Sequence, residues 1–346
     1  MPARLWKAVG LAVALYANRS NPGAGHTMRS NRRFDTRTND ADSPASIPPH
    51  GWWQVTKRVF ARISEDRLLA EAASVTYYTL LAVFPALAAL ISLYGLVADT
   101  STIDKNIGGL DGIIPGGGMQ IIHDQIKSLT SSPSKALGLG AVVGLLTSLW
   151  SANAGVKSLF DALNSVYEQR ETRSFVRLTW LSMLFTLAAL AFIIIALSAV
   201  VILPAVLAFI GFGSFGAILL SLLRWPVLLA AFGVFLAATY RYGPNRRHAK
   251  WQWVSWGSAF AAITWVLASS LFSWYVANFG SYNKTYGSLG AAVGFMTWIW
   301  ISTIIVLIGA ELNAELERQT SCDSTVGAEQ PPGQRGATKA DQVAAA

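Results

Sequence analysis

The stretch Val176–Leu203 reads VRLTWLSMLFTLAALAFIIIALSAVVIL and carries a single charge, Arg177. A helix over these residues rises about 40 Å, which exceeds the roughly 30 Å thickness of a bilayer's hydrocarbon core. The whole chain shares this bias, because 53% of its 346 residues are hydrophobic and only 13% are charged. Soluble domains carry about 25% charge. The sequence therefore indicates an all-α integral membrane protein.

Apolar runs of this kind recur along the chain, and they predict six transmembrane helices. The expected spans cover about residues 73–97, 137–160, 176–203, 215–240, 254–278 and 287–312. Pro85 lies within the first span and predicts a kink there, because proline removes one helical hydrogen bond. Residues 1–50 end in a polar stretch rich in Arg, Asn, Asp, Ser and Pro, and residues 319–346 are rich in Gly, Pro, Ser and Ala. Both segments are therefore predicted to be disordered tails. Met28 is an alternative start to Met1.

Trp52–Arg67, WWQVTKRVFARISEDR, precedes the first span and has the pattern of an amphipathic helix. Trp52, Val55, Val59 and Ile63 fall on one face, with Lys and Arg between them. Such a helix is expected to lie in the membrane interface, with its apolar face toward the acyl chains.

The basic residues predict the orientation, because short cytoplasmic loops collect Lys and Arg. Three connections are basic and alternate with three that are poor in Lys and Arg. The basic residues are Lys57, Arg58, Arg62 and Arg67, then Lys157, Arg170, Arg173 and Arg177, then Arg241, Arg246, Arg247 and Lys250. Both termini are therefore predicted to be cytoplasmic. This placement attributes the net charge of +8 to topology and anionic lipid headgroups, so the lipid bilayer is the expected partner and nucleic acid is not.

Sequence motifs typical of soluble cofactor enzymes do not occur here in the structural context that they require. Gly211–Gly216 reads GFGSFG, but it follows a predicted transmembrane helix where a dinucleotide site requires a strand. The chain has one cysteine, Cys322, and four histidines without the spacing of a zinc site. We therefore assign no catalytic residue, cofactor or metal ligand from the sequence.

Four polar features near the predicted spans are candidates for a functional site. Glu311 and Glu315 share a helix face at the end of the sixth span, either as a solvated terminus or as the polar mouth of an intramembrane cavity. Arg224 lies inside the fourth span, where it either snorkels to the outer interface or pairs within the bundle. Asn153 either hydrogen-bonds between helices or lines a path, and Glu71 precedes the first span.

A polar segment between the last two spans adds two more candidates. Ala277–Ala291 reads ANFGSYNKTYGSLGA, and the charge pattern places it outside the cell. Asn283 and Lys284 lie at its centre. The segment is either a plain connection between helices or a hairpin that lines a path through the membrane.

Several stretches together resemble the YihY/BrkB family of bacterial inner-membrane proteins. They are AEAASVTYYTLLAVFP (70–85), LWSANAGVKSLFDALNSVYEQRETR (149–173), RWP…YRYGPNRR (224–247), YVANFGSYNKTYGSLGA (275–291) and GAELNAELER (309–318). The resemblance covers about residues 52–318. It implies a six-helix protein of the bacterial cytoplasmic membrane without a securely assigned activity. Some members have been labelled ribonuclease BN, a tRNA-processing activity.

Three functions stay open at this point. The first is a transporter or flippase-like protein, in which Arg224, Asn153 and the polar hairpin line a path. The second is a membrane enzyme that uses Glu311 and Glu315 as metal-binding or acid–base groups. The third is a scaffold for envelope assembly. A homo-oligomer is compatible with each of them.

Overall fold

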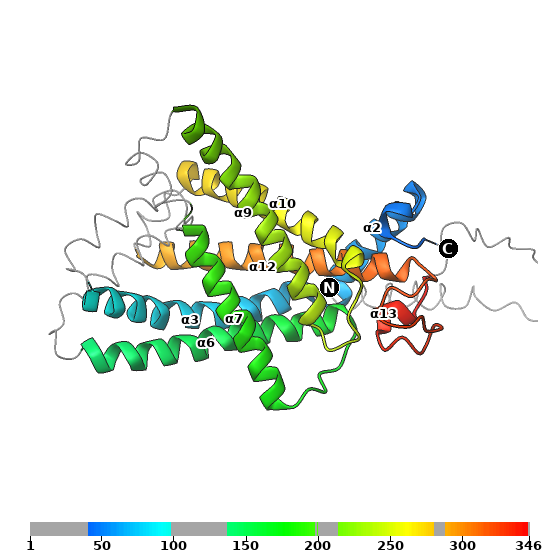
Figure 1. The fold of residues 1–346 in the computed structure, drawn as a ribbon, viewed down its shortest axis with the longest axis horizontal. Helices are drawn as coiled ribbons and strands as arrows, with labels where there is room; N and C mark the ends of the chain where they lie inside the picture. Colours follow the sequence, from blue (N-terminus) through cyan, green and yellow to red (C-terminus); the bar gives the residue numbers. More distant parts are fainter. Residues whose placement is uncertain (1–40, 98–136, 198, 200–213, 280–287, 345–346) are drawn as a thin grey trace, which may run out of the picture. The chain divides into compact units, whose positions relative to one another are not determined.

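A computed structural model of the chain describes residues 41–97, 137–197, 199, 214–279 and 288–344. Regular structure in these ranges is helical, without a strand, which confirms the all-α class. Six long helices are α3 (Leu68–Val97), α6 (Leu137–Val166), α7 (Phe175–Leu197), α9 (Ser214–Tyr242), α10 (Trp251–Phe279) and α12 (Ser288–Arg318) (Figure 1). The short elements are η2 (Pro44–Ser46), α2 (Pro49–Glu65) and α13 (Thr338–Asp341).

By length and apolar composition, four described segments suffice to cross a membrane. They are Phe175–Ala196, Leu222–Tyr242, Trp251–Asn278 and Ala292–Arg318, and Leu68–Ala82 is a shorter apolar helix. A multi-pass membrane protein is thereby confirmed. Six spans, cytoplasmic termini and an interfacial position for α2 stay predictions. Residues 1–40, 98–136, 200–213 and 280–287 lie outside the described part, and with them Asn283 and Lys284 of the polar hairpin.

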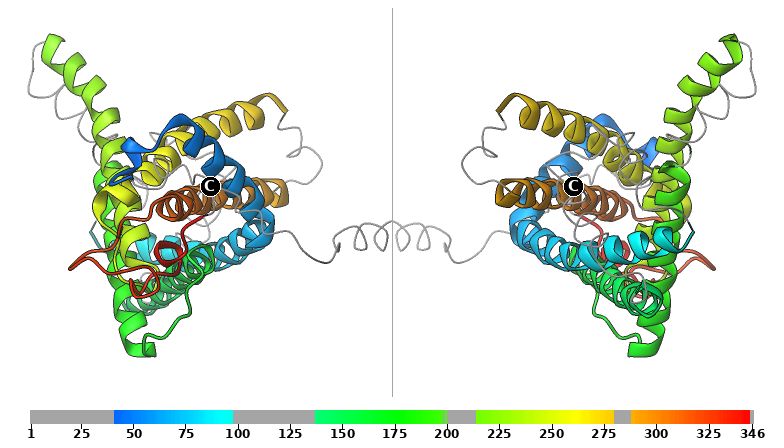
Figure 2. Two further views of the ribbon diagram at one scale, coloured as in Figure 1. Left: turned by 90° about the vertical axis from the view of Figure 1, so that its right-hand side faces the viewer. Right: turned by 90° about the vertical axis from the view of Figure 1, so that its left-hand side faces the viewer.

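α12 is the central helix of the bundle. It contacts α10, α3, α6, α2 and α13, while α3 also packs on α6, α6 on α7, and α9 on α10. Figure 2 shows the same order, with α12 between α10 and α3. The C-terminal turns of α12 therefore meet side chains from several other elements.

α10 and α12 are in close backbone contact at Gly257 and Gly309. A Cβ atom placed on Gly309 would lie 2.7 Å from the carbonyl oxygen of Gly257 and 2.7 Å from Oη of Tyr240. Next to this crossing, the backbone N–H of Gly257 donates to Oδ1 of Asn313 over 2.7 Å. Small residues of this kind let the backbones of membrane helices come into contact.

The outer faces of the long helices suit a lipid environment. Large apolar side chains are widely exposed, among them Trp180 at 73%, Leu222 at 70% and Leu267 at 65%. Hydroxyl groups within the helices bond to the carbonyl four residues earlier, as Thr186 does to Ser182 over 2.8 Å. Because hydrocarbon offers no hydrogen-bond partner, such internal bonds are what a spanning helix requires.

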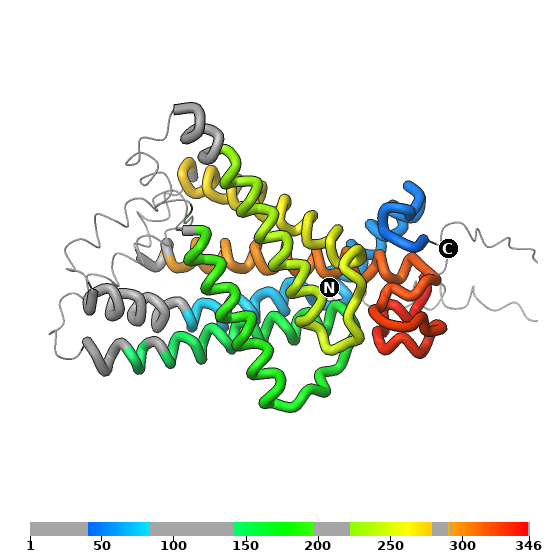
Figure 3. Tube along the Cα trace, in the orientation of Figure 1, coloured from blue at the N-terminus to red at the C-terminus, as the bar shows by residue number. Residues whose placement is uncertain are grey.

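Both predicted tails differ from the expectation of disorder where the structure describes them. Ala41 and Ile47 are buried, and the hydroxyl of Thr320 donates to the carbonyl of Ala41 over 2.6 Å. Residues 319–344 fold beside the C-terminal end of α12 (Figure 3), and the backbone N–H of Ala344 donates to the carbonyl of Arg318 over 2.8 Å. Charged residues of the C-terminal segment such as Lys339 find buried partners, which composition does not show. Residues 1–40 of the predicted N-terminal tail lie outside the described part.

Asp323 shows how that segment is held. Its carboxylate accepts hydrogen bonds from the hydroxyl of Thr325 at 2.7 Å, from the backbone of Thr325 at 2.8 Å and from the backbone of Gln330 at 2.9 Å. Burial raises the pKa of Asp323, but these hydrogen bonds outweigh it and lower the pKa below its ordinary value. An ionised Asp323 therefore fixes the turn that leads to α13.

Candidate functional site

Glu311 and Glu315 lie one turn apart on α12, and both side chains are fully buried. Oε2 of Glu315 accepts a hydrogen bond from Nε of Arg58 on α2 over 2.6 Å. Its Oε1 accepts one from Nη1 of Arg318 over 3.1 Å. Of the two interpretations of this helix end, the solvated terminus does not agree with the burial of Glu311 and Glu315, which α2 and the C-terminal segment cover. The polar mouth of a cavity stays a prediction.

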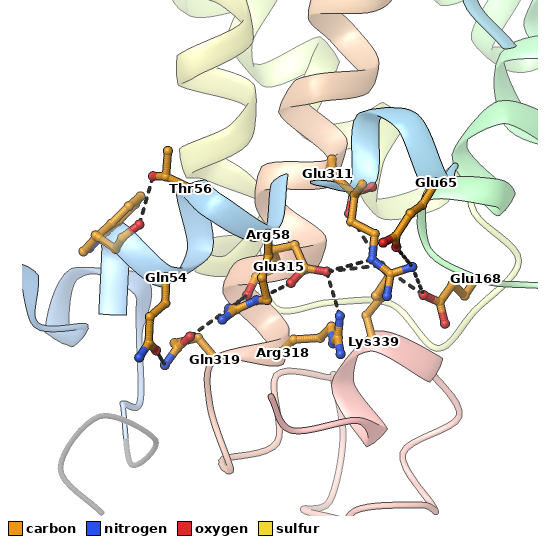
Figure 4. A network of polar contacts seen from close by, with 12 residues as sticks. Gln54, Thr56, Arg58, Glu65, Glu168, Glu311, Glu315, Arg318, Gln319 and Lys339 are labelled. Carbon is orange, nitrogen blue, oxygen red and sulfur yellow. Dashed lines mark hydrogen bonds and ion pairs between the residues drawn. The ribbon is translucent and has the colours of Figure 1, made fainter. Parts of the chain in front are cut away.

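Lys339 on α13 completes the arrangement from the opposite side. Its Nζ lies 3.3 Å from Glu315, 3.5 Å from Glu311 and 3.3 Å from Glu168, and its side chain is fully buried. Arg62 of α2 also contacts Glu168, over 3.0 Å. Figure 4 shows the labelled side chains of this group converging from α2, α12, α13 and the connection that follows α6. We call them the Glu315 cluster: Arg58, Arg62, Glu168, Glu311, Glu315, Arg318 and Lys339.

The Glu315 cluster brings opposite charges together, with one more cation than carboxylates. Three carboxylates face four cations, and both oxygens of Glu315 are engaged by cationic groups. A buried ion pair with good geometry holds its partners together, whereas removing one partner leaves an uncompensated charge. The arrangement therefore joins α2, α12 and the C-terminal segment, and it leaves Glu315 without a free oxygen for a substrate or a metal.

Lys339→Met is expected to loosen the C-terminal segment, because Glu311 and Glu315 would then share fewer cations in a buried place. The expected loss is about 1–3 kcal/mol of docking free energy. Limited proteolysis of the purified protein should cut residues 319–344 sooner than in the wild type. Lys57→Met is the matched control, because Lys57 is exposed and lies over Trp53 outside the cluster. Equal cleavage of both variants would contradict the role given to Lys339.

A second buried ion pair joins Arg246 to Glu317, which lies two residues after Glu315 on α12. Nη1 and Nη2 of Arg246 each donate to Glu317 over 2.8 Å, and both side chains are fully buried. The guanidinium lies 4.2 Å from the ring centroid of Tyr167, and the hydroxyl of Ser324 donates to Glu317 over 3.0 Å. This pair ties the connection after α9 to the end of α12.

The other predicted site residues that the structure describes do not join the Glu315 cluster. Asn153 on α6 is 2% exposed, and its Oδ1 has no hydrogen-bond partner among the described residues. Glu71 on α3 accepts a bond from the hydroxyl of Ser165 over 3.4 Å. Asp161 lies near Glu71, and burial, together with the nearby carboxylates Glu171 and Glu71, raises the pKa of Asp161. Arg224 on α9 lies 5.3 Å from the ring centroid of Trp225. The structure therefore does not gather these residues at one place.

A groove of 670 Å³ between α9 and α10 was not foreseen from the sequence. Its walls are almost wholly apolar, with Pro226, Gly233 and Ala237 from α9 and Trp251 and Ile263 from α10 among its lining residues. The two helices lie side by side in Figure 1. From Pro226 to Ala237 the α9 wall rises about 17 Å, roughly the length of an extended acyl chain. A Cβ atom on Gly233 would meet no atom within 4 Å.

Cations lie on α9 beyond both ends of this groove. Arg224 precedes Pro226 by two residues, and Arg241 lies one turn after Ala237. The guanidinium of Arg241 stacks on Trp251, 4.5 Å from the ring centroid. Its Nε and Nη1 are buried without a hydrogen-bond partner in the described ranges. A half-buried cation in this condition is costly, and an anionic group at the end of the groove would offset the cost.

The spacing of some charged residues in the sequence could have indicated part of the Glu315 cluster. Arg58 and Arg62 are four residues apart, as are Glu311 and Glu315. The two predicted helices therefore each carry a pair of like charges on one face, and the two pairs have opposite sign. Lys339 gave no such signal, because it lies in a polar segment without helical periodicity.

The long apolar helices, their exposed apolar faces and the internally closed polar ends define a multi-pass helical membrane protein. Its sequence matches the model of the virulence factor BrkB family over residues 59–334, and the chain belongs to that family. This confirms the resemblance inferred from the sequence and, with the relatives below, a place in the bacterial inner membrane.

Relatives with curated descriptions carry names of two kinds. The chain is 29% identical to the ribonuclease-like protein YfkH of Bacillus subtilis (strain 168), over 76% of this chain and 95% of YfkH. It is 26% identical to the UPF0761 membrane protein VP0125 of Vibrio parahaemolyticus, over 76% of this chain and 82% of that one. A UPF0761 membrane protein of Vibrio atlanticus is 24% identical, over 77% and 83%. No solved structure matches the chain.

Proposed function

We propose that this protein is a flippase-like transporter, in which an anionic phospholipid moves along the groove between α9 and α10. The observation that carries the proposal is the apolar groove with Arg241 at its end. Apolar walls suit an acyl chain, and Nε and Nη1 of Arg241, which have no hydrogen-bond partner among the described residues, suit a phosphate. Arg224 supplies a second cation near the opposite end, so the headgroup would meet an attractive charge at either limit of the path.

The position of the groove also supports movement. Pro226 lies inside α9 and Gly233 leaves open space on the groove side. Proline and glycine in a membrane helix are where bending is easiest, because proline removes a backbone bond and glycine adds no side-chain packing. A change in the bend of α9 would widen or narrow the groove without breaking the α10–α12 contact.

The test uses purified protein in liposomes that contain a fluorescent phosphatidylglycerol. A membrane-impermeant quencher added outside reports how much label has reached the outer leaflet. We expect wild-type protein to speed this exchange well above protein-free liposomes. Gly233→Leu should slow the exchange at least about tenfold, because the leucine side chain would occupy the groove. A Cβ atom at this position has no neighbour within 4 Å, so the substitution fits without a clash.

Gly233→Ala is the matched control, since one methyl group leaves most of the groove empty. Exchange at the protein-free rate by wild-type protein would overturn the proposal. So would equal rates for wild type and Gly233→Leu, because the lipid would then move elsewhere on the protein. The thermal stability of all variants is measured in the same detergent to show that the fold is intact.

The name of the Bacillus subtilis relative raises RNA cleavage as a second candidate. The carboxylates that the sequence offered for it are Glu311 and Glu315. The Glu315 cluster engages both oxygens of Glu315 but only Oε1 of Glu311, whose Oε2 has no hydrogen-bond partner among the described residues. Metal-dependent RNA cleavage that disappears in Glu311→Gln or Glu315→Gln would favour this alternative over lipid movement.

A further inference from the structure

A second cavity, of 540 Å³, lies beside the start of α7 and the connection that follows α9. It has a polar wall, with Arg173, Arg177, Arg246 and His248. Its other wall is apolar, with Trp180, Leu181 and Leu184 of α7. A cavity of this size is in the range that holds a lipid headgroup and the first part of its chains.

Most charges on the polar wall are neutralised by neighbours. Arg173 donates to Glu171 over 2.8 Å and 2.6 Å, and Arg246 is paired with Glu317. Burial raises the pKa of Glu171, but the hydrogen bonds from Arg173 and Asn164 outweigh it and lower the pKa below its ordinary value. Glu171 therefore stays ionised and keeps Arg173 balanced.

His248 adds little charge at neutral pH. Burial lowers its pKa below the ordinary value, and its Nδ1 donates to the carbonyl of Arg241 over 3.0 Å. Arg177 is different, because its side chain is exposed and forms no ion pair within the described residues. Among the described residues that line the cavity, Arg177 is thus the cation without a carboxylate partner.

The lining residues of α7 share one face of the helix. Arg177, Trp180, Leu181 and Leu184 follow the spacing i, i+3, i+4 and i+7. The cation lies in the first turn of the apolar segment Phe175–Ala196, and the apolar residues follow it deeper along the helix. Trp180 is 73% exposed, as expected of an aromatic residue at the membrane interface. This order matches that of a phospholipid, with its phosphate above its chains.

We infer that this cavity is a binding site for a monoanionic phospholipid, whose phosphodiester contacts Arg177 and whose acyl chain lies on Trp180 and Leu184. A single residual charge matches a monoanionic headgroup such as that of phosphatidylglycerol. A zwitterionic headgroup would bring an ammonium group toward the same arginines. Basic pockets between membrane helices bind anionic headgroups in this manner. The site is separate from the α9–α10 groove, and the inference does not depend on the proposed transport.

The test is thermal stabilisation of the purified full chain in a neutral detergent. A ligand that binds the folded state raises its stability according to its concentration relative to Kd. We titrate phosphatidylglycerol, phosphatidylcholine and inorganic phosphate in separate series. Wild-type protein should be stabilised by phosphatidylglycerol at concentrations at least about tenfold below those needed for the other two.

Arg177→Gln should weaken phosphatidylglycerol binding about tenfold, since it removes one charge-assisted contact. Arg170→Gln, an equal charge change at an exposed residue outside the lining, should leave binding unchanged. Trp180→Ala should weaken the lipid and not free phosphate. The side chains of Arg177 and Trp180 are both exposed, so neither variant threatens folding.

Equal stabilisation by phosphatidylglycerol and phosphatidylcholine would overturn the inference. Equal losses in Arg177→Gln and Arg170→Gln would do the same, because the effect would then be general surface charge. Stabilisation by inorganic phosphate that matches phosphatidylglycerol would also overturn it, because the site would then bind an anion without a place for the chain. Groove variants such as Gly233→Leu should keep normal binding here, which separates this site from the transport proposal.

Discussion

Glu317→Leu alone should lower the free energy of unfolding by about 3–5 kcal/mol, and Arg246→Met alone should cost about as much. Each variant leaves the partner's charge buried, because both side chains have no exposed surface. Ser324 gives Glu317 one further hydrogen bond, and Tyr167 gives Arg246 a ring face. Neither contact replaces the opposite charge.

The double variant Arg246→Met, Glu317→Leu tests the explanation. Removing both charges leaves no uncompensated ion, so most of the lost stability should return. Apparent melting temperatures of the four proteins, at one scan rate in one detergent, supply the cycle. If the two single losses simply add in the double variant, the pair is not coupled and does not hold the connection after α9 to α12.

The polar residues of this chain have two kinds of role. Some hold the bundle together, and others offer sites where a ligand could bind. The Glu315 cluster and the Arg246–Glu317 pair are closed in the sense that each charged group lies beside an opposite charge. Arg241 and Arg177 lack such carboxylate partners within the described part of the chain. We therefore look for ligands at these two cations, and for stability at the closed clusters.

Hydropathy predicted the helices well because a spanning segment must be apolar along its whole length. The expected span 176–203 corresponds to α7 (Phe175–Leu197) and the span 254–278 to α10 (Trp251–Phe279). The ends were less accurate where a helix continues past the apolar run. α12 extends to Arg318, six residues beyond the predicted end, because Glu315 and Glu317 find buried cations there.

The candidate sites were harder to predict because they depend on which helices are neighbours. Nothing in the sequence indicates that Trp251 lies against the guanidinium of Arg241. The two meet because α9 packs against α10. Lys339 lay in a segment whose composition indicated disorder, and only the fold brings it to Glu311. Periodicity identified Glu311 and Glu315 as a pair, but it could not show that other elements cover them.

Gly309→Leu is expected to have the largest effect of any single change in the membrane part. A Cβ atom at this position already meets the carbonyl of Gly257, Oη of Tyr240 and Cβ of Ala261 at 2.7–2.8 Å. The backbone carbonyl cannot move aside as a flexible side chain would, so α10 must separate from α12. Separation would also strain the bond of 2.8 Å from Tyr240 to the carbonyl of Val306. Overpacking costs about 1–3 kcal/mol in tolerant cores, and here it should exceed that range.

Gly233→Leu is the matched comparison for Gly309→Leu, because it adds the same side chain to another glycine of a membrane helix. The difference is the space available, since a Cβ atom on Gly233 has no neighbour within 4 Å. Size-exclusion profiles and melting temperatures should therefore show a large loss for Gly309→Leu and almost none for Gly233→Leu. A similar loss in both would mean that leucine is harmful at any such glycine, and the close crossing of α10 and α12 would lose its support. A stable, monodisperse Gly309→Leu would show that the two helices are further apart than the geometry of Gly257 and Gly309 requires.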